Sequence, residues 1–426
     1  MNTRALPHLA SILKEHEEVH LLWDERLTHK AFLAVGAVRS FTVHAPTLGD
    51  WVAWNAFMEE TKRRNAWAFG WIAYDAHHTL GGYDDPGIPT MPPPVDGWPV
   101  MHWVEPEWVL TWEAGETEPN VWGSTTPPWA SDLHDPQVQA NHREASTPIT
   151  PLEPLWTAEA YDEKFRAVQE ALQRGDLYEM NLCMPWKGAA PGQDAWDLFE
   201  RLTQTTRAPH SAFIQHGKQH VLSASPERFL RKEGSRLMSQ PIKGTVRRGQ
   251  TDDEDQELRL SLANSEKERA ENVMIVDLVR NDLSRVAQPA SVEVDELFGV
   301  HSFATVHQLI SSVSCELKPT TSMLDIMRAT FPMGSMTGAP KPSALQHIAR
   351  LEEQGRGVYS GCIGYKNPEG DFDLNVVIRT LLQNDETGEV HATVGGAITL
   401  LSEGANEYEE CLLKAEALRQ CLHHEG

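Results

Sequence analysis

The sequence predicts a fold of the α+β class, in which helices accompany antiparallel strands. Two observations indicate this class. From Tyr161 onward, helical patterns with an apolar stripe alternate with short strand-like runs. Two pairs of these runs are separated only by turn-forming residues, Arg-Lys-Glu-Gly at 231–234 and Asn-Pro-Glu-Gly at 367–370, so each pair is expected to form a hairpin.

The composition indicates a globular chain with a strongly acidic balance. Apolar residues make up 40% of 426 positions, and 61 acidic side chains against 37 basic ones give a net charge of −24. This charge argues against nucleic acid or an anionic membrane as the main partner, whereas a local basic pocket or a metal can still attract an anionic small molecule. The sequence has no long apolar window and no leader-like N-terminus, so we expect a cytoplasmic protein. Its five cysteines are widely spaced, without a CxxC pair, and are expected to be buried thiols.

A change in amino-acid composition near residue 150 divides the chain into two regions. Residues 1–150 are rich in Trp and Pro, and the segments 83–99 and 135–155 are typical of extended loops. The second segment is expected to connect an N-terminal region, residues 1–150, to a C-terminal region, residues 151–426.

The C-terminal region opens with a predicted helix and a predicted hairpin. Residues 161–176 have helical periodicity, with Gly175 as a stop signal. Residues 220–230 and 235–244 are expected to be the two strands of the hairpin. This register places Glu227 roughly across from Gln240 and brings its carboxyl group within about 10 Å of Lys243 at the open end of the hairpin.

Two later helices each present a pair of glutamates three residues apart. Residues 264–287 place Val276, Val279 and Leu283 on a buried stripe, with Glu268 and Glu271 on a neighbouring face. Residues 405–422 repeat this arrangement, and Glu407, Glu410 and Lys414 share the face beside the buried stripe of Cys411, Ala415, Leu418 and Leu422. Such pairs are usually solvated, and Ser265 with Glu268 fits a helix capping box. The alternative is a Mg2+ site, because Mg2+ prefers carboxylate and water oxygens; spacing leaves both interpretations open.

Four further segments carry residues that could bind a ligand. Residues 331–345 form a Gly-rich turn before a probable helix, which suits an anion but lacks the Walker A pattern. Arg379 ends an apolar run, so it is expected either to pair with an acid in the core or to hold a carboxylate. The strand at 391–401 has consecutive glycines, which suit close backbone approach to a ligand. His307 lies in an apolar strand, where a histidine is more often a core residue than a catalyst.

Taken in order, these motifs resemble those of the chorismate-utilizing enzymes. They are GDLYEMNL, SPERFL, PIKGTVRRG, ENVMIVDLVRNDL, VHQLISSV, FPMGSMTGAPK, GVYSGCIGYKNPEGDFDLNVVIRT, VGGAI and NEYEECLLKAEAL. The resemblance covers roughly residues 155–422, and the first 150 residues resemble the family only around GWIAYDA. It implies an α+β fold in which two antiparallel sheets pack as a sandwich with helices outside.

Within this family, Lys243 in PIKGT is typical of the aminodeoxychorismate synthase branch, since anthranilate synthases have alanine at the matching position. The resemblance therefore implies that chorismate and ammonia are converted to 4-amino-4-deoxychorismate for para-aminobenzoate and folate synthesis, with ammonia supplied by a separate glutamine amidotransferase subunit. The alternatives are an anthranilate synthase large subunit and a non-catalytic subunit that engages a glutaminase.

The resemblance also implies roles for individual residues. Lys243 is the expected covalent nucleophile and Glu227 the acid and base. The expected Mg2+ ligands, direct or through water, are Glu268, Glu271, Glu407 and Glu410. The expected chorismate-binding residues are Tyr359, Arg379, Gly395, Gly396 and Lys414, with Gly244, Thr245, His307, Ser335 and Thr337 elsewhere in the pocket.

Two positions depart from the family pattern. Glu179 occupies a position where many relatives have glutamine and where isochorismate and salicylate synthases have the lysine that activates water, which counts against water as nucleophile. Ala397 replaces a common glycine. The nucleophile assignment also needs a neutral amine: at a reference pKa near 10.4, lowering the pKa of Lys243 by about three units means roughly 4 kcal/mol of destabilisation of its cation. Burial or Mg2+ favours that change, and nearby carboxylates oppose it.

Overall fold

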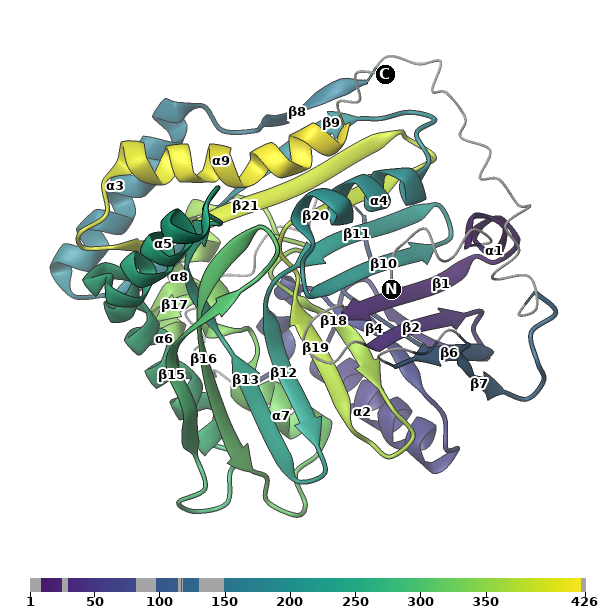
Figure 1. Cartoon of the computed structure of the whole chain (residues 1–426). Coiled ribbons are helices and arrows are strands. Elements are labelled where there is room, and N and C mark those ends of the chain that lie inside the picture. The colour runs from purple at the N-terminus through teal and green to yellow at the C-terminus, as the bar shows by residue number, and fades with distance from the viewer. Residues whose placement is uncertain are drawn as a thin grey trace.

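The computed structural model describes residues 9–24, 30–81, 97–113, 116, 118–129 and 149–422. Two antiparallel sheets form the framework, and each contains strands from both sides of residue 150 (Figure 1). The first sheet has the order β17 (Gly338–Ala339), β9 (Glu179–Ala189), β21 (Glu389–Thr399), β20 (Thr380–Asn384), β11 (Gln219–Ser225), β10 (His210–His216), β1 (Glu18–Asp24), β2 (Lys30–Val35), β6 (Trp108–Trp112) and β7 (Asn120–Gly123), with β8 (Thr150–Pro154) paired to β9. The second has the order β14 (Ile242–Arg247), β16 (Val306–Glu316), β13 (Arg236–Gln240), β12 (Arg228–Glu233), β19 (Phe372–Val376), β18 (Cys362–Lys366), β4 (Ala68–Ile72), β5 (Met101–Glu105) and β3 (Arg39–Val43), with β15 (Glu293–Ser302) paired to β16.

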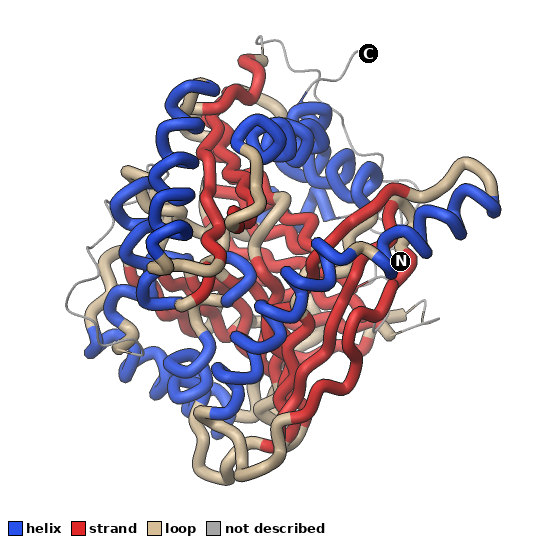
Figure 2. The backbone as a smooth tube through the Cα atoms, turned by 90° about the vertical axis from the view of Figure 1, so that its left-hand side faces the viewer, coloured by secondary structure: helices blue, strands red, loops and turns tan. Residues whose placement is uncertain are grey.

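Helices lie on the outside of these strands (Figure 2). They are α1 (Leu9–Glu15), α2 (Leu48–Arg63), α3 (Ala158–Arg174), α4 (Ala195–Thr206), α5 (Asp252–Asn264), α6 (Glu266–Ser284), α7 (Met323–Thr330), α8 (Lys341–Leu351) and α9 (Gly404–Leu422), with short 3-10 turns η2 (Tyr74–Thr79) and η4 (Gly334–Met336). None of the helices in the described ranges is long and apolar enough to cross a membrane.

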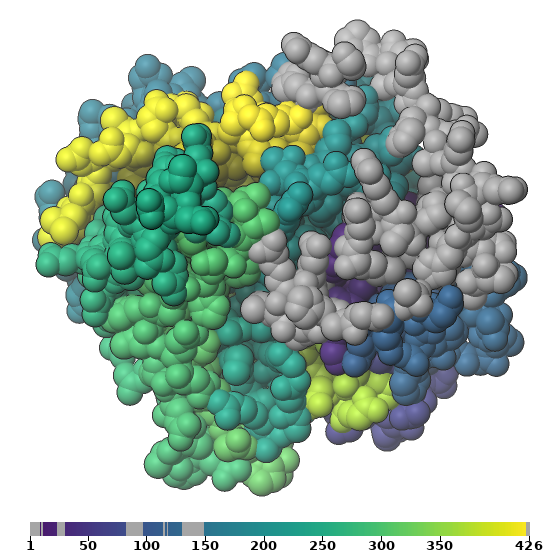
Figure 3. All heavy atoms as spheres, in the orientation of Figure 1, coloured from purple at the N-terminus to yellow at the C-terminus, as the bar shows by residue number. Residues whose placement is uncertain are grey.

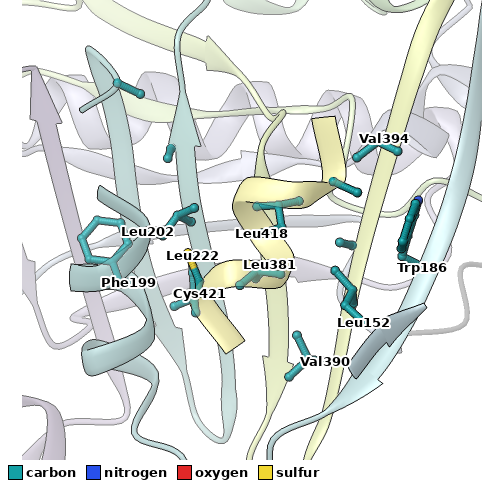
Figure 4. Packing of buried hydrophobic residues seen from close by; sticks show 14 of the residues in the cluster. Leu152, Trp186, Phe199, Leu202, Leu222, Leu381, Val390, Val394, Leu418 and Cys421 are labelled. Carbon is teal, nitrogen blue, oxygen red and sulfur yellow. The ribbon is translucent and has the colours of Figure 1, made fainter. Parts of the chain in front are cut away.

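Three buried clusters show how the layers pack. The cluster between the sheets joins Leu22 and Ile214 of the first sheet to Trp71 and Ile363 of the second. A second cluster packs α3, α4, α8 and α9 on the outer face of the first sheet, as in Figure 4, where Leu418 of α9 lies over Leu381 and Leu222. A third packs α2, α6 and α7 on the outer face of the second sheet. The predicted sandwich with helices outside is confirmed.

Several local predictions are also confirmed. Gly175 ends α3 in the left-handed conformation, which glycine adopts without a steric cost. Strands β18 and β19 form the hairpin expected around residues 367–370. The buried stripes of α6 and α9 are those expected, and all five cysteines are free and buried.

The strand expected at 220–230 is wrong in one respect, because it is two strands. β11 ends at Ser225 in the first sheet and β12 begins at Arg228 in the second. Pro226 lacks the N–H that a continuous ladder needs, and the chain changes sheets there. The hairpin pairs Arg228, rather than Glu227, with Gln240, and Lys243 lies in a further strand, β14, that pairs with β16.

The two loop segments expected in the first 155 residues lie mostly outside the described residues. Of the segment 83–99 only residues 97–99 are described, and of the segment 135–155 only residues 149–155, which contain β8.

Candidate active site

A buried ion pair joins the two sheets at their neighbouring edges. Lys243 lies on β14, the edge strand of the second sheet, and Glu179 begins β9, next to the edge of the first. Lys243 Nζ donates a hydrogen bond of 2.5 Å to Glu179 Oε1, and the side chains are only 9% and 1% exposed. Glu179 Oε2 is also buried and has no hydrogen-bond partner among the described residues. The nitrogen of the expected nucleophile is therefore held by one oxygen of a buried carboxylate.

The charges around Lys243 favour its cation. Burial lowers the pKa of Lys243, but the charges of Glu179, Glu271 and Glu227, with the hydrogen bond to Glu179, outweigh burial and raise that pKa above its usual value. The lowered pKa that attack requires is thus not present in this state. The physical reason is the one the sequence allowed for, because three carboxylates act on the amine.

Glu227 lies at the crossing from β11 to β12, close enough to Lys243 for their charges to interact. Burial raises the pKa of Glu227 to about 7, although a hydrogen bond with Ser335 and the charge of Lys243 act in the opposite direction. A small pocket beside it is lined by Gly334, Ser335 and Ser239 among others. A carboxyl group with this pKa can both donate and accept a proton near neutral pH.

The glutamate pairs of α6 and α9 flank the same place. Ser265 caps α6 by accepting the N–H of Glu268, but the carboxylate of Glu268 lies beside Gly244 of β14. A Cβ atom on Gly244, whose φ is +77°, would lie 2.8 Å from Glu268 Oε2. On α9, the carboxylate of Glu407 similarly faces Gly396 of β21, where a Cβ atom would lie 3.2 Å from Oε2. Glycine at 244 and 396 therefore lets both carboxylates approach the strands closely.

Two of the four glutamates have a raised pKa. Burial, with the charges of Glu268 and Glu179, raises the pKa of Glu271 to about 7 despite Lys243. Burial and the charge of Glu410 also raise the pKa of Glu407. Burial acts in the same direction on Glu410, but the charge and hydrogen bond of Lys414 outweigh it and lower the pKa of that carboxyl. Glu271 and Glu407, with the unpartnered oxygen of Glu179, therefore fit an oxygen-donor site for a hard cation such as Mg2+.

These glutamates do not converge as a preformed cage. Among the described residues, the one group of three metal-ligating side chains whose atoms lie within 4.8 Å of one another is Glu18, His20 and His102, which is elsewhere. An arrangement with both direct and water-mediated ligands is the one compatible with this spacing, since Mg2+ usually keeps several waters.

Arg379 is suited to an anion. It follows β19 with a φ of +52° and is half-buried. Burial lowers the pKa of its guanidinium, and its side chain has no hydrogen bond or ion pair to another residue in the described ranges. The sequence left two interpretations of Arg379 open, a core ion pair and a clamp for a carboxylate. The described residues contain no such ion pair, and a guanidinium without an acidic partner can bind a ligand carboxylate.

Other expected pocket residues have partners within the protein. Lys414 donates 2.8 Å to the carbonyl oxygen of Gly395 and pairs with Glu410 at 2.7 Å. Tyr359 is buried against Cys183. Thr337 is buried and donates to the carbonyl oxygen of Met333, whereas Thr245 is exposed.

His307 has a hydrogen-bond partner at each ring nitrogen. Its Nδ1 bonds Ser302 at 2.8 Å and its Nε2 bonds Asp255 at 3.0 Å, so both ring nitrogens are engaged. Lys341, in the Gly-rich segment, is likewise buried in an ion pair with Asp282. For His307 this is the core role that the sequence offered as the simpler interpretation, whereas the ion pair of Lys341 was not predicted.

The surface over the site is formed by helices that lie next to one another. In the space-filling view, α9 in yellow and α5 in teal-green meet at the surface (Figure 3).

The contact between Glu179 and Lys243 was not expected from the sequence. No local pattern in the sequence predicts that β9 lies beside β14. The one available signal was that residue 179 departs from the family pattern.

Comparison with known proteins agrees with this geometry. The model of the family described as chorismate binding enzyme matches residues 18–420. Aminodeoxychorismate synthase component 1 of Escherichia coli (strain K12) is 44% identical over 266 residues, which is 62% of this chain and 58% of that protein. The protein of the same name from Klebsiella aerogenes is 42% identical over 67% of this chain and 64% of its own length. The aligned part is thus less than two thirds of these relatives.

A relative with lower sequence identity is matched over a larger share of both chains. The anthranilate synthase component I-like protein of Synechocystis sp. (strain ATCC 27184 / PCC 6803 / Kazusa) is 31% identical over 91% of this chain and 76% of its own length. The crystal structure of anthranilate synthase component I from Streptococcus pneumoniae TIGR4 superposes with a TM-score of 0.77, at 24% identity and 92% coverage of both chains. The structure of the menaquinone-specific isochorismate synthase of Escherichia coli gives a TM-score of 0.73 at 18% identity, covering 98% of this chain and 91% of that one. The fold and the sequence match agree, and the chain belongs to the family of chorismate-binding enzymes.

Proposed function

We propose that the chain is an aminodeoxychorismate synthase component I, which converts chorismate and ammonia to 4-amino-4-deoxychorismate for para-aminobenzoate and folate synthesis. The observation that carries the proposal is the buried lysine between two acids: Lys243 bonds Glu179 and interacts with Glu227. The relatives named aminodeoxychorismate synthase component 1 support it.

In the first step, Lys243 must become neutral. Glu179 is the nearest acceptor for its proton, and transfer within this buried pair replaces two charges by two neutral groups, which exclusion of water favours. Lys243 Nζ then forms a bond to C2 of chorismate while both ring double bonds shift, from C1=C2 and C5=C6 to C1=C6 and C4=C5, and the C4–O bond breaks. Glu227 donates its proton to the departing hydroxyl, so that water leaves and Glu227 becomes a carboxylate.

In the second step, ammonia forms a bond to C4. Both double bonds shift back, the C2–N bond breaks, and its electron pair returns to Lys243, which leaves as a neutral amine. Glu227 takes the extra proton from the new amino group, and Lys243 recovers its proton from Glu179. Each side chain ends in its starting state, and the sum of both steps is chorismate plus ammonia giving aminodeoxychorismate plus water.

The remaining residues bind and orient the substrate. Arg379, Lys414, Tyr359 and the backbone of Gly395 and Gly396 hold its carboxylates, and Glu268, Glu271, Glu407 and Glu410 hold Mg2+. When bound, Mg2+ supplies positive charge to a substrate carboxylate and offsets the glutamates that raise the pKa of Lys243. Ammonia comes from a glutamine amidotransferase subunit or from free ammonium.

Incubation with chorismate, Mg2+ and ammonium at alkaline pH, followed by mass analysis of the product, tests the proposal. The expected product retains the pyruvyl ether and carries an amino group at C4. Release of pyruvate with an aromatic amine would instead identify an anthranilate synthase, and no turnover at saturating ammonium would identify a non-catalytic subunit.

A further inference from the structure

Four ionisable side chains meet at a second place in the sandwich, apart from the candidate active site. Glu18 and His20 lie on β1, and β1 pairs with β10 so that Glu18 is directly opposite His216. His102 comes from β5 of the other sheet. Residues 18, 20 and 22 share one face of β1, and Leu22 packs in the cluster between the sheets, so Glu18 and His20 face the second sheet.

The three imidazole rings present nitrogen atoms to one carboxylate. His20 Nε2 lies 2.6 Å and His102 Nε2 3.1 Å from Glu18 Oε1, while His216 Nδ1 lies 2.8 Å from Glu18 Oε2. The ligand atoms of Glu18, His20 and His102 all lie within 4.8 Å of one another. The rings of His20 and His102 are nearly parallel, with centroids 6.3 Å apart.

The surroundings orient these groups and shield them from water. His102 Nδ1 is bonded to Thr42 Oγ1 at 2.8 Å, which fixes the ring and leaves Nε2 directed at Glu18. An outer hydrogen bond of this kind typically accompanies a metal-bound histidine. The Trp71 ring lies 4.6 Å from that of His102, centroid to centroid. The side chain of His216 is 30% exposed, which gives an ion a route from solvent.

Glu18 is bonded to all three rings, and Glu18, His20 and His102 are buried. Imidazoles and one carboxylate are also the donor set that zinc-class ions bind, with Zn–N near 2.0–2.1 Å and a tetrahedral arrangement.

We propose that Glu18, His20, His102 and His216 bind one divalent transition-metal ion of the zinc class. The ion joins β1 and β10 of the first sheet to β5 of the second, so its role is structural: it fixes the N-terminal strands across the sandwich. It is separate from the oxygen-donor site of α6 and α9, because imidazole nitrogens select borderline ions over Mg2+.

Metal titration of the full chain tests this. Protein dialysed against a chelator is titrated with Zn2+ in competition with a chromophoric chelator, and with Co2+ while visible absorption is recorded. We expect one tightly bound Zn2+ per chain, an increase in Tm, and Co2+ absorption typical of tetrahedral coordination. Glu18→Gln and His102→Gln should each weaken Zn2+ binding by at least about tenfold and abolish the Co2+ bands.

Two variants control for misfolding and for loose binding by other histidines. His216→Gln changes the partly exposed member, which is expected to fold, and it should also weaken binding. His391→Gln removes a histidine that pairs with one acid, Glu389, and should leave binding unchanged. No bound Zn2+ beyond loose surface binding, or equal affinity in His216→Gln and the wild type, would overturn the proposal. Chorismate turnover is not a readout, so the outcome is independent of the proposed function.

Discussion

The Nζ atom of Lys243 lies 2.5 Å from Oε1 of Glu179, and this hydrogen bond connects an edge strand of one sheet to the second strand of the other. In the proposed mechanism this pair has two roles at different moments. Glu179 raises the pKa of the resting amine and holds it in place, and it is the proposed acceptor when the proton leaves.

Replacing Glu179 separates these two effects. Glu179→Gln removes a charge that raises the pKa of Lys243, so the pH at which adduct formation with chorismate is half-maximal should fall. Without the acceptor, the maximal rate of adduct formation should also fall about 100-fold, as for loss of a general base. Single-turnover kinetics across pH measure both quantities.

Glu389→Gln is the matched control, because it removes a carboxylate that pairs with Lys187 on the same sheet but away from the site. It should change neither value. A Glu179→Gln profile that overlays the wild type would rule out the proton-acceptor role.

Glu227 should make the protein less stable as the pH rises. Burial raises the pKa of Glu227 to about 7, so between pH 4.5 and 7 the folded state holds a proton that the unfolded state has lost, and folding stability declines over that interval. Glutamine has no charge to bury, so Glu227→Gln should exceed the wild type at pH 8 by up to about 3 kcal/mol, at about 1.4 kcal/mol per pKa unit.

Urea unfolding at pH 4 and pH 8 checks this prediction. Glu227→Gln should be more stable than the wild type at pH 8 and should have no such advantage at pH 4. Glu233→Gln, at the exposed end of β12, serves as control and should show no pH-dependent gain. A Glu227→Gln variant no more stable than the wild type at pH 8 would contradict a buried carboxyl with a raised pKa.

The metal assignment predicts a change in Mg2+ requirement rather than in fold. Glu407→Gln should raise the Mg2+ concentration for half-maximal activity at least tenfold, because a carboxylate that orients the ion or its waters is lost. Glu409→Gln on the same helix is the control, since Glu409 is exposed and should have no effect. Circular dichroism establishes that both variants fold. An unchanged Mg2+ dependence in Glu407→Gln would exclude Glu407 as a ligand.

Arg379 should determine affinity for the substrate. Arg379→Lys keeps a positive charge but loses the planar pair of donors, so KM for chorismate should rise about tenfold or more, through loss of roughly 1.5–3 kcal/mol of charged hydrogen bonding. Arg350→Lys, on the exposed side of α8, should leave KM unchanged. Steady-state kinetics at saturating ammonium distinguish the two. A normal KM in Arg379→Lys would show that the guanidinium does not hold the substrate.

The elements that sequence predicted well are those whose signals are local. The stop at Gly175, the turn at 367–370 and the buried stripes of α6 and α9 each depend on residues a few positions apart. The strand at 220–230 was mispredicted because its apolar pattern continues across Pro226 while the chain moves to the other sheet.

Contacts between distant strands left no comparable signal. Glu179 and Lys243 are 64 positions apart, and Glu18 and His216 are 198 apart. Glu179 and Lys243 meet only when both sheets have formed, and Glu18 and His216 meet only when β1 pairs with β10 in the first sheet. The expected Mg2+ and chorismate residues depended on family motifs, and the raised pKa of Lys243 depended on charges that only the folded structure brings together.

Intact-protein mass measurement tests the central claim most directly. Protein mixed with chorismate and Mg2+, without ammonia, is quenched and weighed, and the modified residue is then located by peptide mapping. The account predicts an adduct equal to chorismate less one water, on Lys243, that disappears when ammonium is added and never forms in Lys243→Ala. An adduct of the same yield in Lys243→Ala, or aminodeoxychorismate formation by that variant at the wild-type rate, would contradict it.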